Sequence, residues 1–282
     1  MNISTLTTGL VLSTSLLLSG CSVNGIANSH VSLDGNEEAA TVNKTIKIDD
    51  FNEIEASQGI KVIYVQGSAK NIAEIATTPS AEKYLKVEVK NHTLKAYYSN
   101  TDDGRNVKIK GPSIIKVSSR DLYEVDLSSA AHLSIEGDLN VKGKFEIDLS
   151  SASSFNASTI NCQNLDADLS SSASAYIDNI IGNLDADLSS ASSFSVNSMS
   201  GNLDVEASSA ASLKIDNIKT SVVSAEASSA STLTIGGISG GNIEASASSG
   251  AKIKLSGKAE YLKHNSSSGG SVNWSDLTVM KK

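Results

Sequence analysis

The second half of the chain alternates apolar and polar residues over short stretches that end in a pair of serines. In residues 184–188 (Leu-Asp-Ala-Asp-Leu), the apolar side chains share one side of an extended strand and the carboxylates share the other. Two serines and a small residue follow, and a second alternating stretch then places Phe194 and Val196 on its apolar side. The pattern predicts two strands that are joined by a tight corner and bury one face each.

The same unit recurs along the chain: an acidic residue, an apolar residue, two serines and a small residue. A repeat of about 20 residues is too short for a helical hairpin or a propeller blade but suits one coil of a β-solenoid. We therefore predict an all-β fold, a parallel β-solenoid with coils of about 20 residues over residues 121–275. The units begin at Asp126, Asp148, Asp168, Asp187, Glu206 and Glu226, with degenerate copies from Ser246 and Asn265.

Two further positions recur within each coil. The residue after the corner is always small, which predicts an inward position where the two strands come close together. A third inward position is apolar, and the variation in coil length falls in the loop after it, so that the strand register is kept. These apolar residues are Ile160, Ile180, Met199, Ile218 and Ile238.

The chain before the repeats also alternates but has no clean period. Residues 44–120 are expected to form an irregular N-terminal β part, either a less regular piece of the same solenoid or a cap like a β-sandwich. Residues 55–62 resemble the corner of the repeat. Because the open end of a solenoid needs a cap, we expect Trp274, Lys281 and Lys282 to cap the C-terminal end, with residues 276–282 forming a tail.

The first residues predict export and a lipid anchor. Residues 1–20 carry no charged side chain and contain a short apolar run, which is typical of a signal peptide. The run ends in Leu18-Ser19-Gly20-Cys21, which resembles a lipobox and predicts lipidation of Cys21. The alternative is an ordinary secretory signal that contains a cysteine. Residues 21–43 are expected to be a flexible tether, and Ser22 favours the outer membrane, at its surface or its periplasmic face.

Composition narrows the classes of function. Only 4% of the residues are aromatic, so the core must be built from small aliphatic side chains. The net charge of −8 argues against nucleic-acid binding, which needs basic patches. No cofactor motif is present in the sequence.

The repeats would stack acidic residues into a column with a spacing of roughly 5 Å. Three interpretations follow: a solvated strand face that keeps the sheet soluble, a line of cation sites, or acid–base catalysis on a polysaccharide. We favour the solvated face, because a catalytic site needs unlike groups that converge in one cleft. The candidates for cation binding are Asp148, Asp168, Asp187, Glu206 and Glu226.

Other chemistry-bearing residues are scattered. No pair among His30, His92, His132 and His264 has metal-ligand spacing, and His132 is expected to face solvent. Cys162 has no CxxC partner and is interpreted as a structural or free thiol. Five of the seven tyrosines are candidates for glycan-stacking surfaces: Tyr64, Tyr97, Tyr98, Tyr123 and Tyr176.

Several motifs together resemble the head GIN domain family of auto-transporter adhesins. They are Phe51 and Ile54, the run 59–67 (Gly-Ile-Lys-Val-Ile-Tyr-Val-Gln-Gly), Asn91-His92-Thr93-Leu94 and the later corners. The resemblance covers roughly residues 44–275 and implies a right-handed β-helix-like fold, a role in adhesion and no catalytic residues. One departure is that the corners read mostly Ser-Ser-Ala, whereas those of the family often read Gly-Ser-Gly.

Three hypotheses on function follow. The first is a lipid-anchored, non-catalytic adhesin or surface-interaction protein, whose partners would be the membrane and a glycan or protein ligand. The second is a periplasmic lipoprotein with a structural or envelope-maintenance role. The third is a polysaccharide-active enzyme on a β-helix.

Overall fold

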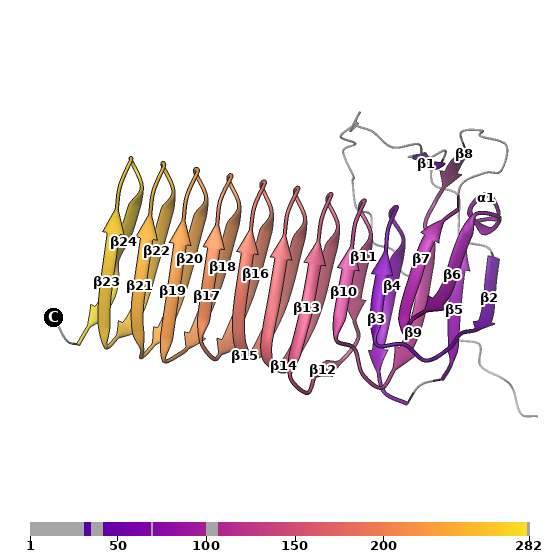
Figure 1. The fold of residues 1–282 in the computed structure, drawn as a ribbon, viewed down its shortest axis with the longest axis horizontal. Helices are drawn as coiled ribbons and strands as arrows, with labels where there is room; N and C mark the ends of the chain where they lie inside the picture. The colour runs from indigo at the N-terminus through magenta and orange to yellow at the C-terminus, as the bar shows by residue number, and fades with distance from the viewer. Residues whose placement is uncertain (1–30, 35–41, 69, 100–106, 281–282) are drawn as a thin grey trace, which may run out of the picture.

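The computed structural model describes residues 31–34, 42–68, 70–99 and 107–280. Stacked coils form one long body with the C-terminus at one end, and the tight corners line up along one edge (Figure 1). Each coil contributes one strand to each of two opposite faces, which we call face A and face B. The solenoid predicted from the repeats is therefore confirmed.

Face A carries the strand that precedes each corner. In spatial order it contains β6 (Leu85–Lys90), β7 (Thr93–Tyr98), β3 (Glu53–Ala56), β10 (Glu124–Leu127), β13 (Lys144–Leu149), the second halves of β14 (Ser154–Leu169) and β15 (Ser174–Leu188), β17 (Leu203–Ala207), β19 (Val222–Ala227), β21 (Asn242–Ala247) and β23 (Tyr261–Ser266).

Face B carries the strand that follows each corner. In the same order it contains β2 (Val42–Lys47), β5 (Ile72–Thr77), β9 (Ile114–Ser119), β4 (Lys61–Gln66), β11 (His132–Ile135), the first halves of β14 and β15, β16 (Ser193–Ser200), β18 (Ser212–Lys219), β20 (Thr232–Ser239), β22 (Lys252–Ala259) and β24 (Ser271–Val279). The short β12 (Asp138–Asn140) also pairs with β14.

The coils pair in parallel and in the register that the sequence predicts. Asp168 lies between Asp148 and Asp187, and the inward Ala167 lies between Ile147 and Ala186. The alternating apolar residues of both faces are buried between them. The third inward position also stacks as expected, since Ile180 pairs with both Ile160 and Met199.

The corners are tight turns whose two central residues have positive φ. At Ser190 and Ala191 the φ values are 52° and 61°, and the Ser192 amide donates to the Ser189 carbonyl at 3.0 Å. This combination is that of a type I′ turn, which usually selects glycine or asparagine. Each turn also bonds the next, because the Ala191 amide donates to the Ser209 carbonyl at 2.9 Å.

The small residue after each corner points inward, as predicted. Ser153 and Ser231 are fully buried, and their hydroxyls donate to the carbonyls of Leu127 and Ala207 at 2.9 Å. Most buried hydroxyls have such a partner, whereas that of Ser192, at the same position of another coil, makes no hydrogen bond among the described residues. In the last coil the position is Gly270, where a Cβ would lie 2.4 Å from the Ala247 carbonyl oxygen.

Residues 44–120 combine solenoid-like and antiparallel pairing. β3 and β4 stack in parallel on β10 and β11, and β7 and β9 continue that stacking. Beyond them β6, β5 and β2 pair antiparallel, close to the short helix α1 (Pro79–Glu82). These antiparallel strands change the direction of pairing at this end of the stack and cover it (Figure 1).

The segment boundaries differ from the expected ones at both ends. Residues 1–20 and most of 21–43 lie outside the described residues, but β1 (Val31–Asp34) falls within the expected tether and pairs in parallel with β8 (Val107–Lys110). At the other end β24 runs through the boundary expected at 275 and ends at Val279. Among the described residues no helix has the length and apolar character that crossing a bilayer requires.

Candidate functional site

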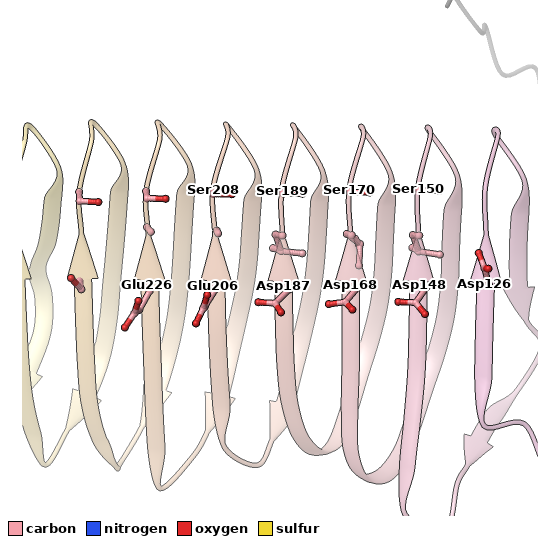
Figure 2. Close-up of a pocket in the computed structure, with 18 residues that line it drawn as sticks. Asp126, Asp148, Ser150, Asp168, Ser170, Asp187, Ser189, Glu206, Ser208 and Glu226 are labelled. Carbon is pink, nitrogen blue, oxygen red and sulfur yellow. The ribbon is translucent and has the colours of Figure 1, made fainter. Parts of the chain in front are cut away.

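The outward side of face A holds an open groove of about 510 Å³ along the solenoid axis. Its floor and walls come from one strand end and one corner of each successive coil, so the same residue types repeat along its length. Figure 2 shows Asp148, Asp168 and Asp187 side by side on neighbouring strands, with Ser150, Ser170 and Ser189 in a second row nearer the corners. The groove thus presents carboxylates along one side and serines along the other.

The five predicted cation candidates all lie in this groove. Backbone pairing places Asp148, Asp168, Asp187, Glu206 and Glu226 in one uninterrupted column, with Asp126 before them and Ser246 after them. Within the described part of the chain, none of these five carboxylates is in an ion pair. We call these five residues the acidic column.

A second line of carboxylates runs two residues earlier on each strand. Here lysines neutralise part of the charge: Lys144 pairs with Glu146 and Asp166, and Lys263 lies 3.3 Å from Glu244. At the N-terminal end Lys95 pairs with Glu55, which continues the register of the acidic column. Positive charge therefore sits beside the acidic column and at its N-terminal end.

Burial and mutual repulsion raise the pKa values of several of these carboxyl groups. For Asp148 and Asp168, partial burial is the larger cause, and the neighbouring carboxylates add to it. For Glu206 the order is reversed, because repulsion from Asp187 and Glu226 raises its pKa more than its slight desolvation does. In the second line, burial and then Asp204 raise the pKa of Asp185.

The arrangement is a line and not a cluster. Within the residues that the structure describes, no three His, Cys, Asp or Glu side chains converge as metal ligands. Successive carboxylates of the acidic column lie on successive strands and face outward, so each interior one has one member of the column on either side of it. Such a line suits a solvated face or diffuse attraction of cations better than coordination of one ion.

The groove also lacks the features of a catalytic centre. Its lining consists of carboxylates, serines and the apolar residues between them, without a histidine, lysine or arginine. General acid–base catalysis requires groups whose environments separate their pKa values. Here the environments repeat from coil to coil, and the pKa shifts that are resolved all point in the same direction.

Cys162 is a buried free thiol whose pKa burial raises to about 11. A thiol with this pKa is almost fully protonated near neutral pH and is a poor nucleophile. The interpretation of Cys162 as a structural or free thiol therefore fits its surroundings.

His132 lies on the outward side of β11, as expected, but its neighbours leave it half-buried. Its Nδ1 lies 2.8 Å from the Ser154 hydroxyl, and burial, with a smaller contribution from Lys61, lowers its pKa. The neighbouring strands β4 and β14 lie on both sides of the ring. A pattern of alternation gives the direction of a side chain but not the size of its neighbours.

Of the tyrosines considered for glycan stacking, Tyr64 and Tyr98 are core residues. Burial raises the pKa of Tyr64 to about 12, and both hydroxyls are satisfied by serines. Tyr123 is 36% exposed and Tyr176 is 47% exposed, so only these two of the candidates are large exposed apolar groups.

Sequence reasoning missed a column of asparagines at the corner opposite the serine turns. Asn183 Nδ2 donates to Asn164 Oδ1 at 3.0 Å, and the backbone N–H of Asn202 donates to Asn183 Oδ1 at 3.0 Å. The Val222 amide then donates to Asn202 Oδ1 at 3.1 Å. The spacing of 19 residues between these asparagines is the signal that could have revealed it.

Two flat faces of stacked coils around a thin apolar core define a β-solenoid protein that presents the same surface many times. A family model described as "Putative auto-transporter adhesin, head GIN domain" matches residues 50–235 and 196–281. The chain therefore belongs to the head GIN domain family, as the sequence motifs indicated. A comparison with curated proteins found no match.

Solved structures share this fold. A "putative adhesin" from Parabacteroides distasonis is 15% identical, with a TM-score of 0.67, over 86% of this chain and 99% of that one. A "putative adhesin" from Parabacteroides merdae is 16% identical, with a TM-score of 0.63, over 86% and 98%. A "putative lipid binding protein" from Parabacteroides distasonis is 19% identical, with a TM-score of 0.59, over 86% and 98%.

Proposed function

We propose that this protein is a lipid-anchored adhesin of the cell envelope that binds its partner without catalysis. The observation that carries the proposal is membership of an adhesin family over most of the chain, together with coils that repeat one outward pattern in register. Repetition lets weak contacts add up along one surface. A glycan or a protein surface is the expected ligand.

The lipid anchor rests on the sequence alone, because residues 18–21 lie outside the described residues. Leu18-Ser19-Gly20-Cys21 would be cleaved before Cys21, which then carries the lipid. Metabolic labelling of producing cells with radioactive palmitate tests this. The full chain is expected to incorporate label and the Cys21→Ser variant to incorporate none, and equal labelling of both would contradict the anchor.

The non-catalytic character is supported by the groove on face A. Its repeated carboxylates and serines offer no convergence of unlike groups, and its lining contains no arginine or histidine. The purified full chain is expected to release no sugar fragments from a broad panel of polysaccharides. Fragments that appear with the wild type and disappear with the Asp168→Asn variant would restore the enzyme hypothesis.

The adhesin role itself is tested by attachment. Cells that produce the chain should attach to epithelial monolayers and extracellular-matrix coatings more than cells that lack it, and the added attachment should be lost when purified protein competes. If producing and non-producing cells attach equally on all surfaces, the adhesin proposal fails. The periplasmic structural role would then be the leading hypothesis.

A further inference from the structure

Tyr176 stands in the middle of face B, opposite the groove. It is 47% exposed and lies on β15 between Asn156 of β14 and Ser195 of β16, which are its direct neighbours in the register. Both neighbours are short and polar, and the Tyr176 hydroxyl donates to Asp178 Oδ1 on the same strand at 3.5 Å, so the exposed ring lies among amides, hydroxyls and a carboxylate. Tyrosine is enriched at recognition surfaces because its ring is apolar and its hydroxyl is polar.

Two polar side chains that hydrogen bonds hold in place follow Tyr176 along β15. Asn197 Nδ2 donates to Asp178 Oδ1 at 2.9 Å, and the Ser198 hydroxyl donates to Asn179 Oδ1 at 2.9 Å. These bonds hold the side chains of Asp178 and Asn179 in place. Asp178 Oδ2 and Asn179 Nδ2 make no hydrogen bond among the described residues, so an acceptor and a donor remain available for a ligand.

The backbone here excludes a peptide that would add as a strand. β15 is already paired on both sides, with β14 and with β16, so no main-chain donors or acceptors are open. A ligand must therefore bind through side chains alone. The surface offers an aromatic ring, a carboxylate and amides.

The local charge argues against an anionic ligand. Lys214 on β18, which lies in register with Tyr176 two strands away, is already paired with Asp216 at 2.6 Å, and Asp178 adds a negative charge. The opposite face carries the acidic column, and the chain has a net charge of −8. Long-range repulsion would thus slow the approach of an anionic polymer.

A sugar ring is an uncharged ligand that can contact the aromatic ring, the carboxylate and the amides of this surface. It has an apolar C–H side that packs against an aromatic ring, and hydroxyls at its rim that both donate and accept. We propose that Tyr176, with Asp178 and Asn179, forms a binding site for an uncharged saccharide chain. This rests on the proposed adhesin function and names the chemistry of its ligand.

Affinity electrophoresis of the full chain tests the site, with dextran, yeast mannan and laminarin as neutral probes and hyaluronate as the anionic probe. Wild type is expected to be retarded by at least one neutral probe and not by hyaluronate. Tyr176→Ala should weaken that binding about tenfold and Tyr176→Phe by less than about threefold, since the ring and not the hydroxyl makes the contact. Tyr123→Ala, which removes an exposed tyrosine elsewhere, is the matched control and should bind as wild type.

The inference is overturned if no neutral probe retards the wild type, if hyaluronate alone does, or if Tyr176→Ala binds as tightly as wild type. Circular dichroism of each variant establishes that it is folded. An attachment assay with cells that produce each variant distinguishes failure of the saccharide site from failure of the proposed adhesin function. If cells with Tyr176→Ala attach as well as wild type, the saccharide site fails and the adhesin stands, whereas loss of attachment by Tyr176→Ala and not by Tyr123→Ala supports both.

Discussion

At the scale of single residues, the acidic column carries repulsion between like charges that destabilises the folded state. Each interior carboxylate lies beside two others on neighbouring strands, and like charges directly opposite one another destabilise a sheet. This repulsion adds to burial in raising the pKa values of Asp148 and Asp168, and it is the main cause of the raised pKa of Glu206. The same charges keep a flat, long sheet soluble and discourage pairing with other chains.

The pH dependence of stability follows from these shifts. Because the pKa values of Asp148, Asp168 and Glu206 are raised, the folded chain binds more protons than the unfolded chain just above the ordinary carboxyl pKa of about 4. These groups therefore make stability fall as pH rises through that window. We expect these carboxyl groups to favour a higher thermal midpoint near pH 5 than at pH 7. Two groups act in the opposite direction: His132, whose pKa burial lowers, and Glu88, whose pKa a hydrogen bond from Lys90 lowers.

The Asp168→Asn variant isolates the effect. At pH 7 its thermal midpoint should rise by about 1–3 °C, because one repulsive charge is removed from the column. Its midpoint should also vary less between pH 5 and pH 7 than that of wild type. A variant that is less stable than wild type at pH 7 would show that the carboxylate makes a favourable contact, such as cation binding.

Much of the residue-level detail could be predicted because alternation and repeat coincide. The inward direction of Ala167, the outward direction of Asp168 and their neighbours in adjacent coils all follow from a period of two within a period of about 20. The half-buried His132 and the hydrogen-bonded polar side chains that follow Tyr176 could not be predicted. They depend on side-chain lengths across strands, which no periodicity contains.

At the scale of elements, the corners combine local strain with stacking. Ser and Ala occupy the left-handed region in the inner corners, where a side chain costs roughly 1 kcal/mol relative to glycine. Hydrogen bonds between successive turns offset this cost, as between Ala191 and Ser209. Glycine takes the second turn position in the last two corners, as Gly250 and Gly269, where fewer coils follow to hold the turn.

Replacing an inner alanine tests this balance. Ala191→Gly is expected to stabilise the fold by about 0.5–1 kcal/mol, because relief of strain at a φ of 61° exceeds the added flexibility of the unfolded chain. Urea unfolding measures it, with Ala186→Gly, in a strand, as the destabilised control. Loss of stability in Ala191→Gly would mean that the turn is not strained.

At the scale of the whole molecule, the two ends of the solenoid are finished differently. Antiparallel strands and α1 cover the N-terminal end. At the C-terminal end, His264 takes the inward position of Ala245, and its ring lies 5.7 Å from that of Trp274, beside an irregular register in β24. Trp274 was expected to cap this end from the sequence, and its placement suits that role, while Lys281 and Lys282 lie outside the described residues.

If Trp274 caps the C-terminal end, its removal should increase local unfolding of the last coil. Trp274→Ala should speed amide hydrogen exchange in β23 and β24 about tenfold and leave β16 and β18 unchanged, because only the last coil loses packing. Tyr261→Ala is the control, since Tyr261 is 45% exposed on the outward side of the same coil. Equal exchange in Trp274→Ala and wild type would contradict a capping role.

The irregular N-terminal part could be predicted less well than the repeats. Residues 55–62 were recognised as a corner because they keep the pattern around Gln58 and Gly59, which do have positive φ. The antiparallel strands β2, β5 and β6 occur once each, so no repeat fixes their partners. Nothing in the alternation of a single strand states whether it pairs parallel or antiparallel.

Protease shaving of intact cells is the measurement that tests the central claim most directly. An antibody to residues beyond 120 would follow the solenoid before and after treatment. A lipid-anchored adhesin must face outward, so the account predicts that the solenoid is lost from intact cells while a periplasmic marker survives. A solenoid that is protected on intact cells and digested only after lysis would contradict the adhesin and place the protein in the periplasm.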